Sequence, residues 1–311
     1  MNWNIQIRKD LELTREEIES LIEEKKNLLN EIESQLGKGS NYFSELSEMA
    51  LLQLEIEQYN ESENNFLTCL SFFKKQNDRL GQAAVLGVMG TLYLKKGAYS
   101  SSIDSYENAR RIYEELKQIK EQITCLMGIG NALMKLNRLQ EACDSYLECA
   151  AICSDNNDMY GLLDCLGNLI YIHETQDKWD VVYELYKKTL KAFKELHDIQ
   201  GIITSYFNLG LLQKNKNREE ALRYFKKGTN YAIDANYSDL IIKGLSYVAE
   251  TLFYLGNIRK AKDQLIKALF LAENVNAKNA TLQIKILLKS FGLNDEDIDN
   301  ELDLYKNSKK N

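Results

Sequence analysis

Gly90–Ala109 reads GTLYLKKGAYSSSIDSYENA, a stretch with a small residue at each end and the aromatic residue Tyr106 near its close. The same spacing recurs along the chain at intervals of about 40 residues. The aromatic or large apolar position is occupied in turn by Phe66, Tyr106, Tyr146, Tyr186, Phe225 and Leu265. Small residues nineteen apart recur as Ala50 and Cys69, Gly90 and Ala109, Gly130 and Cys149, and Ala249 and Ala268. A fixed period of this length predicts one helical unit repeated six times.

The boundaries of the unit are also periodic. A bulky residue is expected to begin the second helix of most repeats, at Tyr59, Tyr99, Leu139, Trp179 and Ile258. Asp78, Asp158 and Asp198 each stand three residues before a glycine. An Asp side chain in this place accepts hydrogen bonds from the first free backbone N–H groups of a helix. Each of the three is therefore predicted to cap the first helix of a repeat.

These residues resemble the pattern of the tetratricopeptide repeats. The matching positions in one repeat are Gly90, Tyr93, Gly97, Tyr99, Ser102, Tyr106 and Ala109. The resemblance covers roughly residues 41–275, with a period of 40 rather than 34 and no closing proline, since the chain has none. Both departures resemble the long-helix subtype of Pins-like adaptors, kinesin light chains and Rap-type regulators. The resemblance implies an all-α, right-handed superhelix, an α-solenoid of six helix-turn-helix repeats with a flanking helix at each end.

Two repeats depart from the pattern. In repeat four, Ile170 and Val182 stand where small residues are expected. Repeat five is one residue short at the Lys214–Glu220 turn. One elongated domain is favoured over two, because each repeat of a solenoid packs only on its neighbours.

Four segments follow from these patterns. Residues 1–40 are expected to form a long amphipathic helix, 41–275 the repeats, 276–292 a capping helix and 293–311 a charged tail. Within residues 9–36, an imperfect heptad seam is interrupted by Thr14, Lys25 and Gln35. The helix is interpreted as a cap on the first repeat, with a short dimerising coiled coil as the alternative. We predict a monomer, and a weak dimer through residues 9–36 as the alternative.

Charge and composition exclude several classes of protein. The net charge is −7 and the sequence pI is about 5.2, so nucleic-acid binding is not expected. Met1–Asp10 lacks the apolar stretch of a signal peptide, and no run approaches the length of a membrane span. We predict a cytoplasmic protein without membrane insertion. The six cysteines are interpreted as reduced residues of the repeat lattice, with Cys143, Cys149 and Cys153 as a redox-sensitive alternative.

No catalytic or metal-binding motif is complete. His173 begins H-E-x-x-D instead of the H-E-x-x-H that a zinc helix requires. Gly37–Ser40 imitates the end of a phosphate loop, but Ile32 stands where that loop needs a glycine. Asp295–Asp299 imitates the start of an EF-hand loop, but Lys306 occupies the position of the bidentate glutamate. We therefore predict no enzymatic activity, no cofactor and no bound metal.

Function is therefore expected on the surfaces of the repeats. The resemblance implies that the first helices line a concave groove, at Met127, Asn131, Met134, Asn168, Tyr171, Glu174, Phe207, Asn208, Lys214, Tyr247 and Tyr254. Asn131, Asn168 and Asn208 are suited to hold the backbone of an extended peptide, because an amide side chain both donates and accepts. Met and Tyr side chains would supply adaptable and rigid contacts beside them.

The favoured function is a non-catalytic adaptor or scaffold that binds a protein or peptide partner in this groove. The alternatives are a peptide-responsive regulator of the Rap type and a structural assembly subunit. Rap-type sensors carry a three-helix bundle before the repeats, and the single long helix here favours the adaptor. The lysine stripe of Lys187, Lys188, Lys191 and Lys194 is interpreted as a solvated face. Its alternative role is to dock an acidic segment, such as the chain's own Asp295–Asp303.

Overall fold

The computed structural model describes residues 13–309, and the predictions that fall on residues 1–12 lie outside them. Over the described range the chain forms fifteen α-helices and no strand, which confirms the all-α prediction. The chain divides into two compact units, with the boundary between Asn157 and Asp158. The repeat period predicted one elongated domain and did not indicate this division. Each unit is described by itself.

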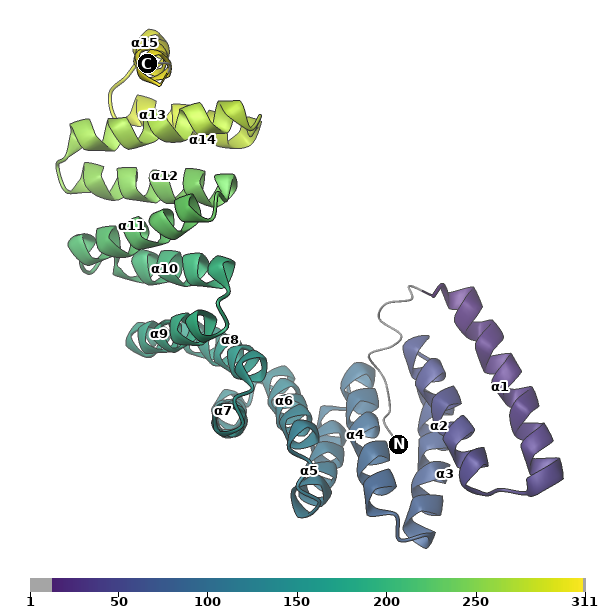
Figure 1. Cartoon of the computed structure of the whole chain (residues 1–311). Helices are drawn as coiled ribbons and strands as arrows, with labels where there is room; N and C mark the ends of the chain where they lie inside the picture. Colours follow the sequence, from purple (N-terminus) through teal and green to yellow (C-terminus); the bar gives the residue numbers. More distant parts are fainter. Residues whose placement is uncertain (1–12, 310–311) are drawn as a thin grey trace. The chain divides into compact units, whose positions relative to one another are not determined.

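The first unit is a succession of antiparallel helices, each packed on the next (Figure 1). Its helices are α1 (Arg15–Leu36), α2 (Ser40–Glu55), α3 (Tyr59–Lys75), α4 (Arg79–Lys96), α5 (Tyr99–Glu115), α6 (Ile119–Lys135) and α7 (Leu139–Asp155). The long helix α1 lies against α2 through the buried side chains of Ile18, Ile22 and Leu29. Lys25, which interrupts the heptad seam, forms ion pairs with Glu45 and Glu48 of α2.

The second unit continues the same alternation of first and second helices. Its helices are α8 (Met159–Thr175), α9 (Trp179–Glu195), α10 (Ile199–Gln213), α11 (Arg218–Asp234), α12 (Ser238–Tyr254), α13 (Ile258–Asn274), α14 (Lys278–Ser290) and α15 (Asp295–Ser308). The five residues predicted to begin second helices are the first residues of α3, α5, α7, α9 and α13. Helix α14 packs on α13, and α15 folds back on both (Figure 1).

The C-terminal helix α15 is anchored by apolar side chains. Ile298 and Leu302 are buried against the rest of the second unit. Asn294 and Asp297 form a reciprocal capping box, in which each side chain accepts a hydrogen bond from the other residue's backbone N–H. The segment that imitates an EF-hand loop therefore begins a helix, and the carboxylate of Asp297 is used to cap it.

The turns between helices share one backbone conformation. A left-handed residue, with φ between +53° and +83°, ends most helices, at Glu57, Asn77, Gly97, Lys117, Asn137, Asn157, Asp177, His197, Asn236, Gly256 and Asn276. Asn and Gly occupy most of these positions because they tolerate this conformation best. Asp78, Asp158 and Asp198 follow three of these residues and accept hydrogen bonds from the N–H of Gly81, Gly161 and Gly201 at 2.9–3.0 Å. The three predicted helix caps are thereby confirmed.

The repeated aromatic residues pack on the repeated glycines. A Cβ atom added to Gly90 would stand 2.7 Å from the ring of Tyr106, and one added to Gly130 would stand 2.6 Å from the ring of Tyr146. The ring of Tyr106 also covers Gly128 of the following repeat, where an added Cβ would approach to 2.4 Å. Each glycine therefore admits a ring that an alanine would displace.

Repeat four shows what happens without the glycine. Ile170 takes the place that corresponds to Gly130, and its side chain is buried. Tyr186, the ring residue of this repeat, is only half-buried, and its hydroxyl donates to Glu174 at 3.3 Å. Burial and the neighbouring Glu174 raise the pKa of Tyr186 to about 12. The irregular residues seen in the sequence thus shift the ring toward the surface.

Three glycines on or beside α4 should respond differently to alanine. Gly87→Ala should raise the free energy of unfolding by about 1 kcal/mol, because its Cβ would meet no atom within 4 Å and alanine favours a helix. Gly90→Ala should lower it by about 1 kcal/mol, since overpacking on the ring of Tyr106 costs about 1–3 kcal/mol and helix propensity offsets about 1 kcal/mol. Gly97→Ala should lower it by about 1 kcal/mol, because φ is +83° there.

The measurement is denaturant unfolding of the three variants, followed by circular dichroism. All three substitutions add the same methyl group, so each is a control for the others. A stability change of the same sign in all three would contradict the assignment of the glycine contacts.

The described residues also bear on membrane association. None of the helices within 13–309 combines the length and the apolar character that a bilayer crossing requires.

Candidate functional site: the faces of the first helices

The predicted groove residues lie on the first helices α6, α8, α10 and α12, with Lys214 at the end of α10. Their exposure differs. The side chains of Asn131, Tyr171 and Tyr254 are exposed. Half-buried positions are Met127, Met134, Asn168, Glu174, Asn208, Lys214 and Tyr247. Phe207 alone among them is buried.

Phe207 is therefore a correction to the predicted groove. Its side chain is 3% exposed and belongs to the core of the second unit. Added Cβ atoms at Gly228 and Gly244 would stand 2.7 Å and 2.9 Å from its ring, so the ring fills the space that these two glycines leave. Tyr247 packs on the ring edge-on, with 5.5 Å between centroids. Because the ring of Phe207 is packed on three sides, it stabilises the fold and is inaccessible to a ligand.

Helix α10 makes the central part of this face uncharged. Ile199–Gln213 carries no charged residue, and buried side chains lie on most of its circumference. Asn208 is half-buried on this uncharged helix, while Leu211 one turn later is 41% exposed. Asn168 takes the same position in α8, and Tyr247 takes it in α12, because repeat five is one residue short. A strip of amide and phenol groups therefore crosses the first helices of the second unit.

The hydrogen bonds of the three asparagines differ. The amide of Asn208 has no hydrogen-bond partner among residues 13–309. Asn168 donates one N–H to the carbonyl of Asp164 at 3.1 Å, which leaves its side-chain oxygen available. Asn131 belongs to the first unit, where its side-chain oxygen accepts from the hydroxyl of Tyr146 at 2.7 Å. Each side chain keeps groups that a peptide backbone can satisfy.

Charged residues stand at the end of this strip. The ammonium of Lys214 lies 2.7 Å from a carboxylate oxygen of Glu250 on α12, and both side chains are 27% exposed. The guanidinium of Arg218 lies over the ring of Tyr254, 5.2 Å from its centroid. The sequence suggested Lys214 and Tyr254 as separate contacts. The structure instead gives each an intramolecular partner that fixes its position.

Two of the cysteines, Cys69 and Cys125, offer little thiolate. All six are buried. Burial raises the pKa of the Cys69 thiol to about 11 and that of the Cys125 thiol to about 12. Because the thiolate is the reactive form, these two residues are inert near neutral pH. Both observations agree with a structural role in the repeats.

Known proteins resemble this chain in sequence and in fold. A family model described as tetratricopeptide repeat matches residues 124–156, which lie in α6 and α7. Regulatory protein RapD of Bacillus subtilis (strain 168) is 31% identical over 114 residues, which cover 36% of this chain and 32% of RapD. The match thus spans about a third of that relative's length.

Solved structures share the fold over a longer range. The apo form of RapI superposes with a TM-score of 0.59 and 15% identity, over 94% of this chain and 85% of RapI. Aspartyl phosphate phosphatase F from Bacillus subtilis superposes with a TM-score of 0.52 and 15% identity, over 86% of this chain and 74% of that one. At this level of identity the likeness concerns the fold alone.

Proposed function

We propose that the chain, which resembles the tetratricopeptide-repeat proteins, binds an extended peptide segment of a protein partner on the first helices of its second unit. The observation that carries the proposal is the amide of Asn208, which is half-buried on an uncharged helix and has no partner among residues 13–309. The atoms of this amide are open to solvent, so a ligand can replace water as its hydrogen-bond partner. A peptide backbone offers an N–H and a carbonyl group at matching spacing.

The surroundings of Asn208 define the ligand. Helix α10 has no charge to pair with, so the central part of the peptide should be uncharged. The exposed side chains of Leu211 and Tyr171 provide apolar contact on one side of the amides. The Lys214 and Glu250 pair supplies one charge of each sign at the end of the strip. Met127, Asn131 and Met134 lie on α6 of the first unit, where Asn131 takes the position of Tyr171 and Leu211 rather than that of Asn168 and Asn208.

The role that we propose is that of a non-catalytic adaptor. A second candidate, a peptide-responsive regulator, is favoured by the sequence similarity to RapD, whose name describes it as a regulatory protein. The two differ in one property. A regulator should change hydrogen exchange in helices remote from the bound peptide, whereas an adaptor should protect only the binding strip. A structural assembly subunit would instead associate with itself in light scattering.

The double variant Asn168→Ala with Asn208→Ala should bind peptide about tenfold more weakly. Each lost amide contact contributes about 0.5–1.5 kcal/mol, and 1.4 kcal/mol corresponds to a factor of ten. The probe is a labelled peptide selected from a random display library on the unaltered chain, with affinity measured by fluorescence anisotropy. Thermal stability should stay nearly unchanged, because both side chains are partly solvated.

Exposed asparagines on other helices provide the matched control. Asn64→Ala on α3 and Asn279→Ala on α14 make the same chemical change away from the strip and should retain full affinity. Asn131→Ala tests α6 of the first unit separately. If the double variant kept its full affinity, the binding site would lie elsewhere, and replacing Lys187, Lys188 and Lys191 by Glu would test the lysine stripe of α9.

A further inference from the structure

A groove lies on the side of the second helices, between α11 and α13. Its volume is about 460 Å³. The floor is apolar and consists of Leu245, Val248 and Leu252 of α12. Leu222 and Ile233 of α11 extend this apolar surface up one wall, where Ile233 is 50% exposed. The three floor side chains are only 4–8% exposed, so Ile233 provides most of the apolar surface that is open to a partner.

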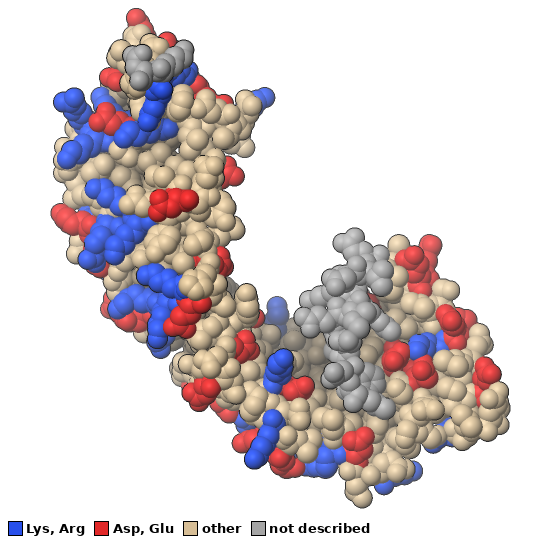
Figure 2. Space-filling view, in the orientation of Figure 1, with Lys and Arg blue, Asp and Glu red and all other residues tan. Residues whose placement is uncertain are grey.

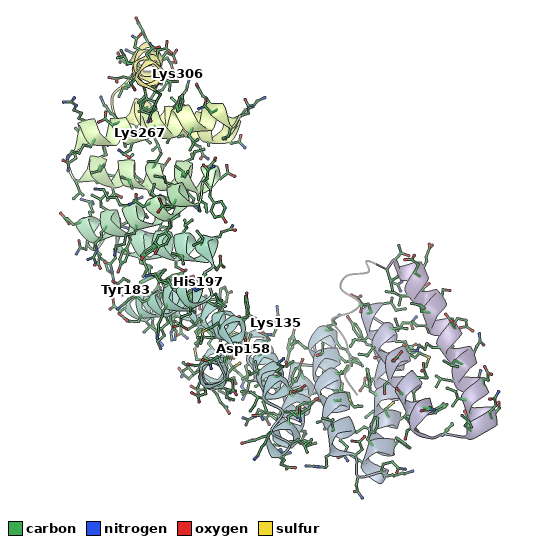
Figure 3. The ribbon with its side chains drawn as sticks, in the orientation of Figure 1. Lys135, Asp158, Tyr183, His197, Lys267 and Lys306 are labelled. Atoms are coloured by element: carbon green, nitrogen blue, oxygen red, sulfur yellow. The ribbon has the colours of Figure 1, made fainter. Side chains whose placement is uncertain are left out.

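The rim of this groove is cationic. Lys226 of α11 and Lys260 of α13 line it, together with the carboxylate of Asp263. Neither lysine forms an ion pair within the described part of the chain. Figure 2 shows Lys and Arg side chains gathered along the left edge of the second unit, and Figure 3 labels Lys267 on α13.

The lysine stripe of α9 is different, because its charges are partly neutralised. Lys187 pairs with Glu184 at 3.0 Å, and Lys191 lies 3.7 Å from Glu195. Both pairs join neighbours on one helix, so the carboxylates lower the positive electrostatic potential of this stripe. Unlike Lys187 and Lys191, the two lysines that line the groove between α11 and α13 have no ion pair among the described residues.

The chain's own acidic tail does not neutralise this rim. In α15, Asp295 pairs with Lys289 at 2.9 Å, and Asp299 lies 3.6 Å from Lys285. Both lysines belong to α14. Lys306 of α15, labelled in Figure 3, pairs with Glu273 of α13 at 3.1 Å. Asp295 and Asp299 are therefore engaged on α14 and do not neutralise the rim of the groove.

We propose that the groove between α11 and α13 docks an acidic, amphipathic segment of a protein partner. Carboxylates of the segment face Lys226 and Lys260, and its apolar side chains rest on Leu245, Val248 and Leu252. A protein segment fits better than nucleic acid, because its apolar side chains pack on the floor, where a phosphate backbone makes no favourable contact. Asp263 lies in the same wall, so the carboxylates of the segment must lie opposite the two lysines and away from Asp263. This site is distinct from the peptide strip, which lies on the first helices.

The probe is a fluorescein-labelled synthetic helix with leucines at alternating three- and four-residue steps and glutamate at all other positions. Binding to the full chain is followed by anisotropy, and protection of α11 and α13 by hydrogen exchange. Lys226→Glu combined with Lys260→Glu should weaken binding about tenfold, which corresponds to 1.4 kcal/mol. Ile233→Ser should also weaken it, and affinity should fall as salt is added.

Lys187→Glu combined with Lys188→Glu on α9 is the matched control, since it makes the same charge change outside the groove. It should leave affinity and thermal stability unaltered. The proposal is overturned if the acidic helix does not bind, or if both double variants weaken it equally. It is also overturned if a short DNA duplex or phosphatidylserine vesicles bind with the same dependence on Lys226 and Lys260. Self-association that disappears in the groove variant would assign the site to a second copy of the chain.

Discussion

Tyr146→Ala should lower the free energy of unfolding of the first unit by about 3–5 kcal/mol. The ring is fully buried, and it occupies the space beside Gly130, which has no side chain that could move into the void. Its hydroxyl also donates to Asn131 at 2.7 Å. The measurement is thermal unfolding by circular dichroism, where the midpoint should fall by roughly 10 °C for a unit of this size.

Two further variants show whether the loss of stability comes from the buried ring or from its hydroxyl group. Leu147→Ala removes an apolar side chain that is 51% exposed on the same helix, and it should have little effect. Tyr146→Phe removes only the hydroxyl and should cost about 1 kcal/mol. Hydrogen exchange should increase in α6 and α7 more than in α2, because a repeat transmits damage chiefly to its neighbours. An unchanged midpoint for Tyr146→Ala would show that the repeat register is wrong.

Phe207→Ala should destabilise the second unit by about 3–5 kcal/mol as well. The ring fills the space that Gly228 and Gly244 leave between α10, α11 and α12, so its removal opens a cavity that two glycines cannot close. Denaturant unfolding checks the expected loss. The result decides between two roles, because a residue that lines a peptide groove would change affinity and leave stability almost intact.

Tyr254→Ala is the control for Phe207→Ala. Its ring is 54% exposed and touches Arg218, so truncation should change stability by less than about 1 kcal/mol. Equal stability losses in the two variants would contradict the assignment of Phe207 to the core.

The sequence was sufficient to predict the helices because their signals are local. Asp78, Asp158 and Asp198 cap the helices that they were expected to cap, and second helices begin at the predicted residues. Phe207 was wrongly placed because its environment is not local. Its position corresponds to the half-buried Met127 in another repeat, and only glycines 21 and 37 residues downstream explain why the ring is inside.

The groove between α11 and α13 was missed for a related reason. The closely spaced lysines of α9 gave a conspicuous pattern, whereas Lys226 and Lys260 lie 34 residues apart and meet only when α11 and α13 pack on α12. The neutralising partners of the α9 lysines are visible in the sequence, since Glu184 and Glu195 stand three and four residues from them.

The rings of Tyr106 and Tyr146 each pack on a glycine at a fixed spacing. This spacing determines whether a whole repeat can be lost from the chain. Gly90 and Tyr106 are sixteen residues apart, and so are Gly130 and Tyr146. Removing residues 91–130 would therefore bring Tyr146 to the same spacing from Gly90 and restore a complete contact at the new junction. Loss of a whole repeat is thus a small step for this part of the chain.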